Sequence, residues 1–184
     1  IDVNPDGTRA ALIFTNAAEA SNLYEIDLQS GAMTALGQSM LGGVDPADMV
    51  IPELIAYPTH DGRMIPAWLY RPKVEGDKFP VVLSIHGGPE AQERPRYNYN
   101  GLYQYLLSRG FAILAPNIRG STGYGITYQR LIYRDWGGAE LGDIEHAAKY
   151  LRTLDWVDAN RIAVYGGSFG GFATLSAVTR LPDY

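Results

Sequence analysis

Cysteine is absent from this chain of 184 residues, so disulfide bonds, thiolate metal ligands and a cysteine nucleophile are excluded. Charge is also sparse, because Asp, Glu, Lys and Arg make up 19% of the residues and leave a net charge of -5. That balance provides no basic surface for nucleic acid or an anionic membrane. No apolar run approaches the roughly 18 residues of a membrane span. We therefore expect neither nucleic acid nor a membrane as a partner.

What the chain does have is enough apolar material for a substantial core. Hydrophobic residues make up 46% of it, which is typical of a globular protein and not of a disordered one. The chain begins at Ile1 with neither methionine nor a signal peptide, and we expect it to be a piece of something longer. The compartment cannot be read from that start, although the lack of cysteine favours the cytoplasm.

Residues 1–36 carry three strand signals separated by turn residues. We expect strands over 10–14, 22–28 and 32–36, because apolar runs and polar–apolar alternation are bounded there by Asn, Asp, Gly and Ser. Three short strands of this kind are similar to most of one β-propeller blade; the alternative is a β-hairpin extension of the domain that follows. Residues 37–52 show no sustained period, and we expect them to form a linker.

From residue 53 onward, strand and helix patterns alternate. The segments 54–59 and 64–70 predict a hairpin around Asp61-Gly62, with His60 exposed in the turn, and their prolines favour a position at a sheet edge. The rest of the pattern predicts an α/β sandwich. The predicted strands are 79–85, 111–115 and 161–165, and the predicted helices are 101–108 and 142–153, the second carrying His146 as a structural residue.

The stretch Gly166-Gly167-Ser168-Phe169-Gly170-Gly171 is the strongest candidate site. It stands between the apolar strand 161–165 and the helical pattern 172–178. A G-x-S-x-G between a strand and a helix is the nucleophile elbow of α/β-hydrolases, in which a sharp turn exposes the serine at the head of the helix. We therefore expect Ser168 to be a nucleophile; the alternative is an ordinary structural turn.

Two glycine-rich loops follow other predicted strands. The stretch His86-Gly87-Gly88-Pro89 ends strand 79–85, where an α/β-hydrolase presents an N–H group of its oxyanion hole; the alternative is a plain turn. The loop 116–125 lacks both phosphate-binding glycine motifs, and we expect it to be a structural loop near the mouth of the site. We also hypothesise that Asp143 holds Arg119 in this region.

Four motifs occur in an order that is far more specific than any one of them alone: 67–72 (AWLYRP), 86–89 (HGGP), 116–125 (PNIRGSTGYG) and 158–171. With these motifs the chain resembles the prolyl oligopeptidase family of serine peptidases, in its acylaminoacyl-peptidase and dipeptidyl-peptidase-like branch. The resemblance implies an α/β-hydrolase domain over 53–184 that follows a β-propeller.

The same resemblance implies roles for individual residues. Ser168 would be the nucleophile, and the backbone N–H groups of Gly88 and Phe169 would form the oxyanion hole. His86 would shape that hole without being the catalytic histidine. No metal or organic cofactor is implied.

We expect the whole protein to hydrolyse short peptides through an acyl-enzyme, with a carboxylesterase or a non-catalytic binding protein as alternatives. An α/β-hydrolase supplies its triad in the order Ser, then Asp or Glu, then His. Residues 169–184 follow Ser168; they contain no histidine, and Asp183 is their one carboxylate. We therefore predict that this polypeptide alone is catalytically incomplete, a prediction that hydrolysis lost in Ser168→Ala would overturn. Exo- or endopeptidase preference and oligomeric state stay open.

Overall fold

The computed structural model describes residues 1–181. The chain divides into two compact units. The first combines residues 1–51 with 95–104, and the second combines residues 52–94 with the chain from 105 onward. No helix in the described part of the chain is both long and apolar enough to cross a lipid bilayer.

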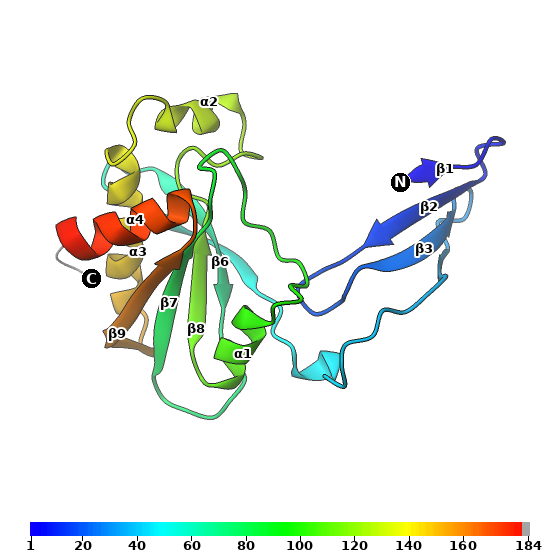
Figure 1. Ribbon diagram of the computed structural model, residues 1–184, viewed down its shortest axis with the longest axis horizontal. Coiled ribbons are helices and arrows are strands. Elements are labelled where there is room, and N and C mark those ends of the chain that lie inside the picture. Colours follow the sequence, from blue (N-terminus) through cyan, green and yellow to red (C-terminus); the bar gives the residue numbers. More distant parts are fainter. Residues whose placement is uncertain (182–184) are drawn as a thin grey trace. The chain divides into compact units, whose positions relative to one another are not determined.

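The first unit is built on a four-stranded antiparallel sheet in the order β1-β2-β3-β4 (Figure 1). Six pairs from Arg9↔Asp27 to Phe14↔Asn22 join its two long strands. The sheet has the form expected of a propeller blade, and the sequence missed one strand, which is two residues long. The strands are β1 (Asp2–Val3), β2 (Arg9–Phe14), β3 (Asn22–Asp27) and β4 (Met33–Ala35), and a short 3-10 helix, η1 (Pro46–Asp48), follows in the predicted linker.

The second unit contains a mixed five-stranded sheet in the order β5-β6-β8-β7-β9. Strands β5, β6 and β8 pair antiparallel, whereas β7 pairs parallel with both β8 and β9. The apolar run predicted to be a central strand is β7. Because β7 is parallel to both of its neighbours, the carboxyl ends of β7, β8 and β9 lie at the same edge of the sheet. The strands are β5 (Glu53–Pro58), β6 (Met64–Tyr70), β7 (Phe79–Ile85), β8 (Ala112–Pro116) and β9 (Val157–Gly166).

The two strands of the 54–70 hairpin were both predicted to lie at a sheet edge because of their prolines, and one of them does. Strand β5 is an edge strand, as expected, but the prediction is wrong for β6, which lies between β5 and β8. Pro66 is tolerated there because pairing with β8 begins only at Ala67. The Pro66 carbonyl accepts instead from the backbone N–H of Asn117, at 2.8 Å.

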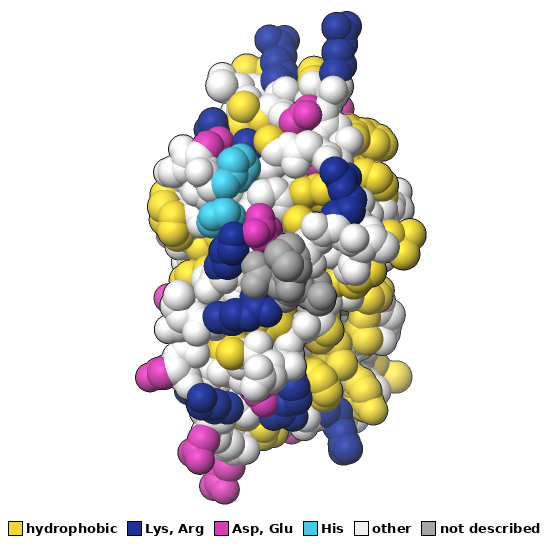
Figure 2. Space-filling view, turned by 90° about the vertical axis from the view of Figure 1, so that its left-hand side faces the viewer, with side chains coloured by type: hydrophobic (Ala, Val, Ile, Leu, Met, Phe, Trp, Pro, Cys, Tyr) yellow, Lys and Arg dark blue, Asp and Glu magenta, His cyan; other side chains and the backbone are white. Residues whose placement is uncertain are grey.

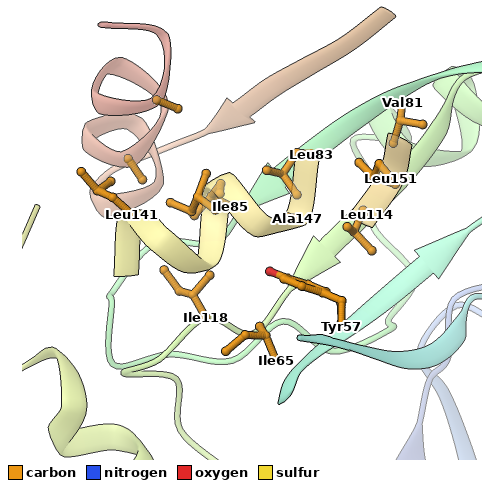
Figure 3. Close-up of a cluster of buried hydrophobic side chains, with 14 of the residues drawn as sticks. Tyr57, Ile65, Val81, Leu83, Ile85, Leu114, Ile118, Leu141, Ala147 and Leu151 are labelled. Carbon is orange, nitrogen blue, oxygen red and sulfur yellow. The ribbon is translucent and has the colours of Figure 1, made fainter. Parts of the chain in front are cut away.

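Two helices cover one face of this sheet (Figure 1). Val81, Leu83 and Ile85 alternate along β7 and pack with apolar side chains of α3 and α4 (Figure 3). Alternation along a strand sends these side chains to the same face, which makes that face the core. The helical segments are α1 (Leu102–Ser108), α2 (Ile126–Gln129), η2 (Arg130–Ile132), α3 (Ala139–Arg152) and α4 (Phe169–Arg180).

Helix α3 begins three residues earlier than the sequence predicts. Its first-turn acid is Glu140, and Asp143 lies in the second turn. The buried Glu140 carboxylate accepts from the backbone N–H groups of Gly137 and Gly138, so it satisfies two donors at the start of the helix. Burial raises the pKa of Glu140, and these donors only partly offset that effect.

Candidate active site

Ser168 occupies a sharp turn between β9 and α4. Its backbone has φ 55° and ψ -123°, a conformation that non-glycine residues rarely adopt, and the residue is exposed. A Cβ added at Gly170 would collide with the backbone carbonyl of Ile85, so glycine is required for the helix to pack this close to β7. Strained backbone held by such packing is typical of functional sites.

The loop after β7 passes beside Ser168. The carboxyl ends of β7 and β9 meet, because Ile85 pairs with Gly166 in the parallel ladder. A Cβ added at Gly87 would lie 3.4 Å from the Ser168 Cβ and 3.9 Å from its Oγ. Two of the sequence motifs are therefore adjacent in space.

Gly88 makes the chain turn back directly after this point. It has φ 124°, and a Cβ there would lie 2.7 Å from the backbone nitrogen of Glu90. Any other residue would be strained and would clash. The Gly88–Pro89 peptide bond is cis.

His86 holds the peptide group between Gly87 and Gly88. Its Nδ1 lies 2.7 Å from the Gly87 carbonyl oxygen, and its Nε2 lies 2.9 Å from the Ser121 Oγ. Burial lowers the pKa of His86, which favours the neutral ring. We assign Nδ1–H as the donor to Gly87, because a carbonyl oxygen can only accept, and the Ser121 hydroxyl donates to the Ile118 carbonyl at 2.7 Å. Because the Gly87 C=O and the Gly88 N–H belong to one planar group, this bond fixes the direction of the Gly88 N–H.

Asn117 clamps the far end of the same loop, a role that the sequence did not reveal. Its buried side chain accepts from the backbone N–H of Glu93 at 2.7 Å and donates to the Glu93 carbonyl at 3.2 Å. The backbone N–H of Thr122 donates to the Ala91 carbonyl at 2.8 Å. The signal that could have indicated Asn117 is its place at the carboxyl end of a buried strand.

The hypothesised pair of Arg119 and Asp143 is confirmed. The Arg119 Nε and Nη2 donate to the Asp143 carboxylate at 2.9 and 2.7 Å, and the Arg119 backbone N–H adds a third bond at 2.9 Å. Asp61 contacts the Arg119 Nη1 at 3.2 Å. Burial alone would lower the pKa of Arg119, but the two carboxylates outweigh it and raise that pKa. The charged pair anchors the loop that carries Ser121.

The ring of Phe169 fixes the first turn of α4. It is buried, and it packs edge-on against Trp136 at a centroid distance of 5.3 Å and at a tilt against Phe172 at 5.7 Å. Trp136 itself is 62% exposed. The aromatic contacts therefore hold the residue after Ser168 in place, so its backbone N–H keeps one direction at the head of the helix.

The other two histidines belong to the surface of α3. His60 is exposed in its turn, and its ring centroid lies 6.0 Å from that of His146, whose Nδ1 donates to the Gly142 carbonyl at 2.9 Å. Figure 2 shows neighbouring histidine side chains at the surface. Within residues 1–181, no three His, Asp or Glu side chains are arranged to hold a metal ion. Asp183 lies outside the described residues.

Known proteins share both sequence and fold with this chain. Residues 97–184 match the prolyl oligopeptidase family. An uncharacterized peptidase of Bacillus subtilis, YuxL, is 33% identical over 177 residues, which is 94% of this chain and 26% of that protein. The crystal structure of a puromycin hydrolase superposes with a TM-score of 0.86 at 30% identity, over 97% of this chain and 28% of that one. The chain belongs to the prolyl oligopeptidase family.

Other members of the prolyl oligopeptidase family match shorter stretches. Dipeptidyl aminopeptidase BIII of Pseudoxanthomonas mexicana is 39% identical over 104 residues, or 56% of this chain and 15% of that protein. The predicted fold class is confirmed: a propeller-blade-like antiparallel sheet precedes a mixed sheet with helices that matches the α/β-hydrolase part of these structures. The chain spans about a quarter of the length of the relatives that it matches over most of its own length.

Proposed function

We propose that the whole protein hydrolyses short peptides through an acyl-enzyme formed on Ser168. One observation carries this proposal: Ser168 is exposed in a strained turn at the head of α4, and the Gly87-Gly88 loop passes beside its hydroxyl. A nucleophile and two backbone donors that converge on one point are what acyl transfer needs. Homology to serine peptidases, among them a dipeptidyl aminopeptidase and a puromycin hydrolase, supports the reaction class.

The proposed reaction proceeds in two halves. The Ser168 Oγ attacks the scissile carbonyl carbon while a base takes its proton, and the carbonyl oxygen becomes an oxyanion. The backbone N–H groups of Gly88 and Phe169 donate to that oxyanion. The base then gives the proton to the leaving amine, and water hydrolyses the ester that remains. Each donor is expected to contribute about 3 kcal/mol to the stability of the transition state.

The base is not one of the three histidines of this chain. His86 is committed to Gly87 and Ser121, and His60 and His146 lie together at the surface of α3. An α/β-hydrolase places its acid and its histidine after the nucleophile in the chain. We assign both to the remainder of the whole protein. The predicted domains, a blade over 1–36, a linker over 37–52 and a hydrolase over 53–184, belong to the same proposal.

Active-site labelling of the whole protein tests the proposal. A fluorophosphonate should modify Ser168 in the wild type and leave Ser168→Ala unmodified. Hydrolysis of a dipeptide p-nitroanilide should disappear in the same variant. An absence of labelling would favour a binding protein without turnover, and hydrolysis of a p-nitrophenyl ester without hydrolysis of the anilide would favour a carboxylesterase.

A further inference from the structure

Glu90 lies two residues beyond Gly88, in the loop that passes beside Ser168. It is exposed, and the turn at Gly88 brings its backbone nitrogen within 2.7 Å of the position that a Gly88 Cβ would occupy. The glutamate side chain therefore starts next to the proposed oxyanion donor. The sequence alone does not indicate a role for Glu90, because an exposed glutamate in a loop has no local signature.

Two neutral donors hold the Glu90 carboxylate by one oxygen. Its Oε2 accepts from the Gln129 side-chain amide at 2.5 Å and from the Tyr133 hydroxyl at 3.0 Å. The bond to Glu90 raises the pKa of Tyr133, so the phenol keeps the proton that it donates. Both donors come from the segment formed by α2 and η2, which lies in a different part of the sequence.

The other oxygen of Glu90 remains available. Among residues 1–181, Oε1 accepts no hydrogen bond, and no Lys, Arg or His nitrogen lies within 4.0 Å of the carboxylate. Arg130 acts electrostatically on Tyr133 without forming such a pair. The Glu90 carboxylate is therefore a negative charge held in one orientation, with no cation beside it in the part of the chain that the structure describes.

The loop under Glu90 is also rigid. Ala91 is tied to Thr122, and Glu93 is tied to Asn117, so the backbone is held on the carboxyl side of Glu90. Gly87, on its amino side, is tied to His86. A charge placed on such a support binds a counter-charge without first having to be ordered.

We propose that Glu90 is a specificity-determining residue that binds the free α-ammonium group of the substrate through Oε1. This inference rests on the proposed function. Two extended residues span about 7 Å. The Glu90 side chain is shorter than that, but its length and the N···O distance of an ion pair together cover a similar span from the Glu90 backbone. The amino end of a substrate cleaved after its second residue therefore falls within reach of Glu90. Peptides with an unblocked N-terminus are preferred over acyl-blocked ones, which distinguishes the two activities of the branch that the sequence resembles.

Matched substrates test the proposal in the whole protein. Glycyl-phenylalanine p-nitroanilide carries the ammonium group, and its N-acetyl derivative does not. In Glu90→Gln, kcat/KM for the free substrate should fall about ten- to one-hundred-fold, the range of a lost charged hydrogen bond, and the N-acetyl substrate should change less than twofold. Equal losses on both substrates would show that Glu90 only ties the loop to α2, and would overturn the proposal.

A control variant and a donor variant sharpen the comparison. Glu75→Gln removes another exposed carboxylate, which precedes β7 at the opposite end of the strand from Glu90, and both substrates should be unaffected. Tyr133→Phe keeps the Glu90 charge and removes one of its two donors. It should raise KM for the free substrate a few-fold and leave KM for the N-acetyl substrate unchanged. A loss of kcat/KM on both substrates would again indicate that Glu90 only ties its loop to the segment of α2 and η2.

Binding without turnover separates this inference from the proposed function. In Ser168→Ala, calorimetry should show that glycyl-phenylalanine amide binds at least tenfold more tightly than its N-acetyl derivative, and that Glu90→Gln abolishes the difference. A Glu90-dependent preference in a protein that never hydrolyses either p-nitroanilide would support Glu90 and refute the peptidase. Turnover without any such preference would support the peptidase and refute the role of Glu90.

Discussion

Replacing Asp143 by asparagine removes one charge from a buried pair and changes almost no volume. The Arg119 side chain is 5% exposed and the Asp143 side chain is fully buried, and three hydrogen bonds run from Arg119 to this one carboxylate. Removing one partner of a buried pair costs about 3–5 kcal/mol, because the other charge is left without compensation. Asp61 still contacts Arg119 at 3.2 Å, so we expect the lower end, about 3 kcal/mol.

Urea unfolding, followed by tryptophan fluorescence, measures this cost. Asp61→Asn is the matched control: Asp61 is 35% exposed, and its loss should cost less than about 1 kcal/mol. In thermal melts, Asp143→Asn should lower the midpoint by roughly 6–12 °C. The double variant Arg119→Met with Asp143→Leu should recover most of the loss, since no charge is then buried. Equal, small costs for the two asparagine variants would refute the reasoning, because they would mean that water reaches Arg119.

Three further predictions concern the elbow and the loop beside it. Gly170→Ala should destabilise the protein by about 1–3 kcal/mol in denaturant unfolding because its Cβ meets a β7 carbonyl, whereas Gly171→Ala, with room for a methyl group, should be neutral or stabilising. Since burial lowers the pKa of His86, the folded state binds a proton at this ring less readily than the unfolded state does. Thermal melts should therefore show stability that falls as the pH drops below about 6.5 and through the lower pKa of the folded state. His86→Gln should flatten this dependence. Asn117→Ala frees the backbone of Glu93 and should slow fluorophosphonate labelling roughly tenfold or more; an unchanged rate would contradict the clamp.

Elements with a strong local pattern were predictable from the sequence. The apolar run of β7 and the Asp-Gly hairpin between β5 and β6 needed no information from elsewhere in the chain. Helix α2 was missed because four residues in a glycine-rich loop have no periodicity to detect. The early start of α3 depends on Glu140 folding back onto two glycine N–H groups, a capping arrangement that the apolar spacing of the helix does not encode.

In the candidate site too, some residues were predictable from the sequence and others were not. Ser168 and Gly88 were found because their glycine neighbours are required locally, by a sharp turn and by close backbone approach. Asn117 and Glu90 were not, because their roles arise from partners far away in the sequence: Asn117 binds a residue 24 positions away, and Glu90 binds residues 39 and 43 positions away. Such contacts exist only once the sheet has aligned the loops.

The discontinuous first unit has a consequence for synthesis on the ribosome. Residues 1–51 emerge early, but the side chain of Gln104 accepts from the Val50 N–H at 2.9 Å and donates to the Val50 carbonyl at 3.0 Å. At the usual pace of translation these partners are made about 3–10 s apart. The backbone N–H and C=O of Val50 therefore stay without these partners until residue 104, which follows strand β7 of the second unit, has been made.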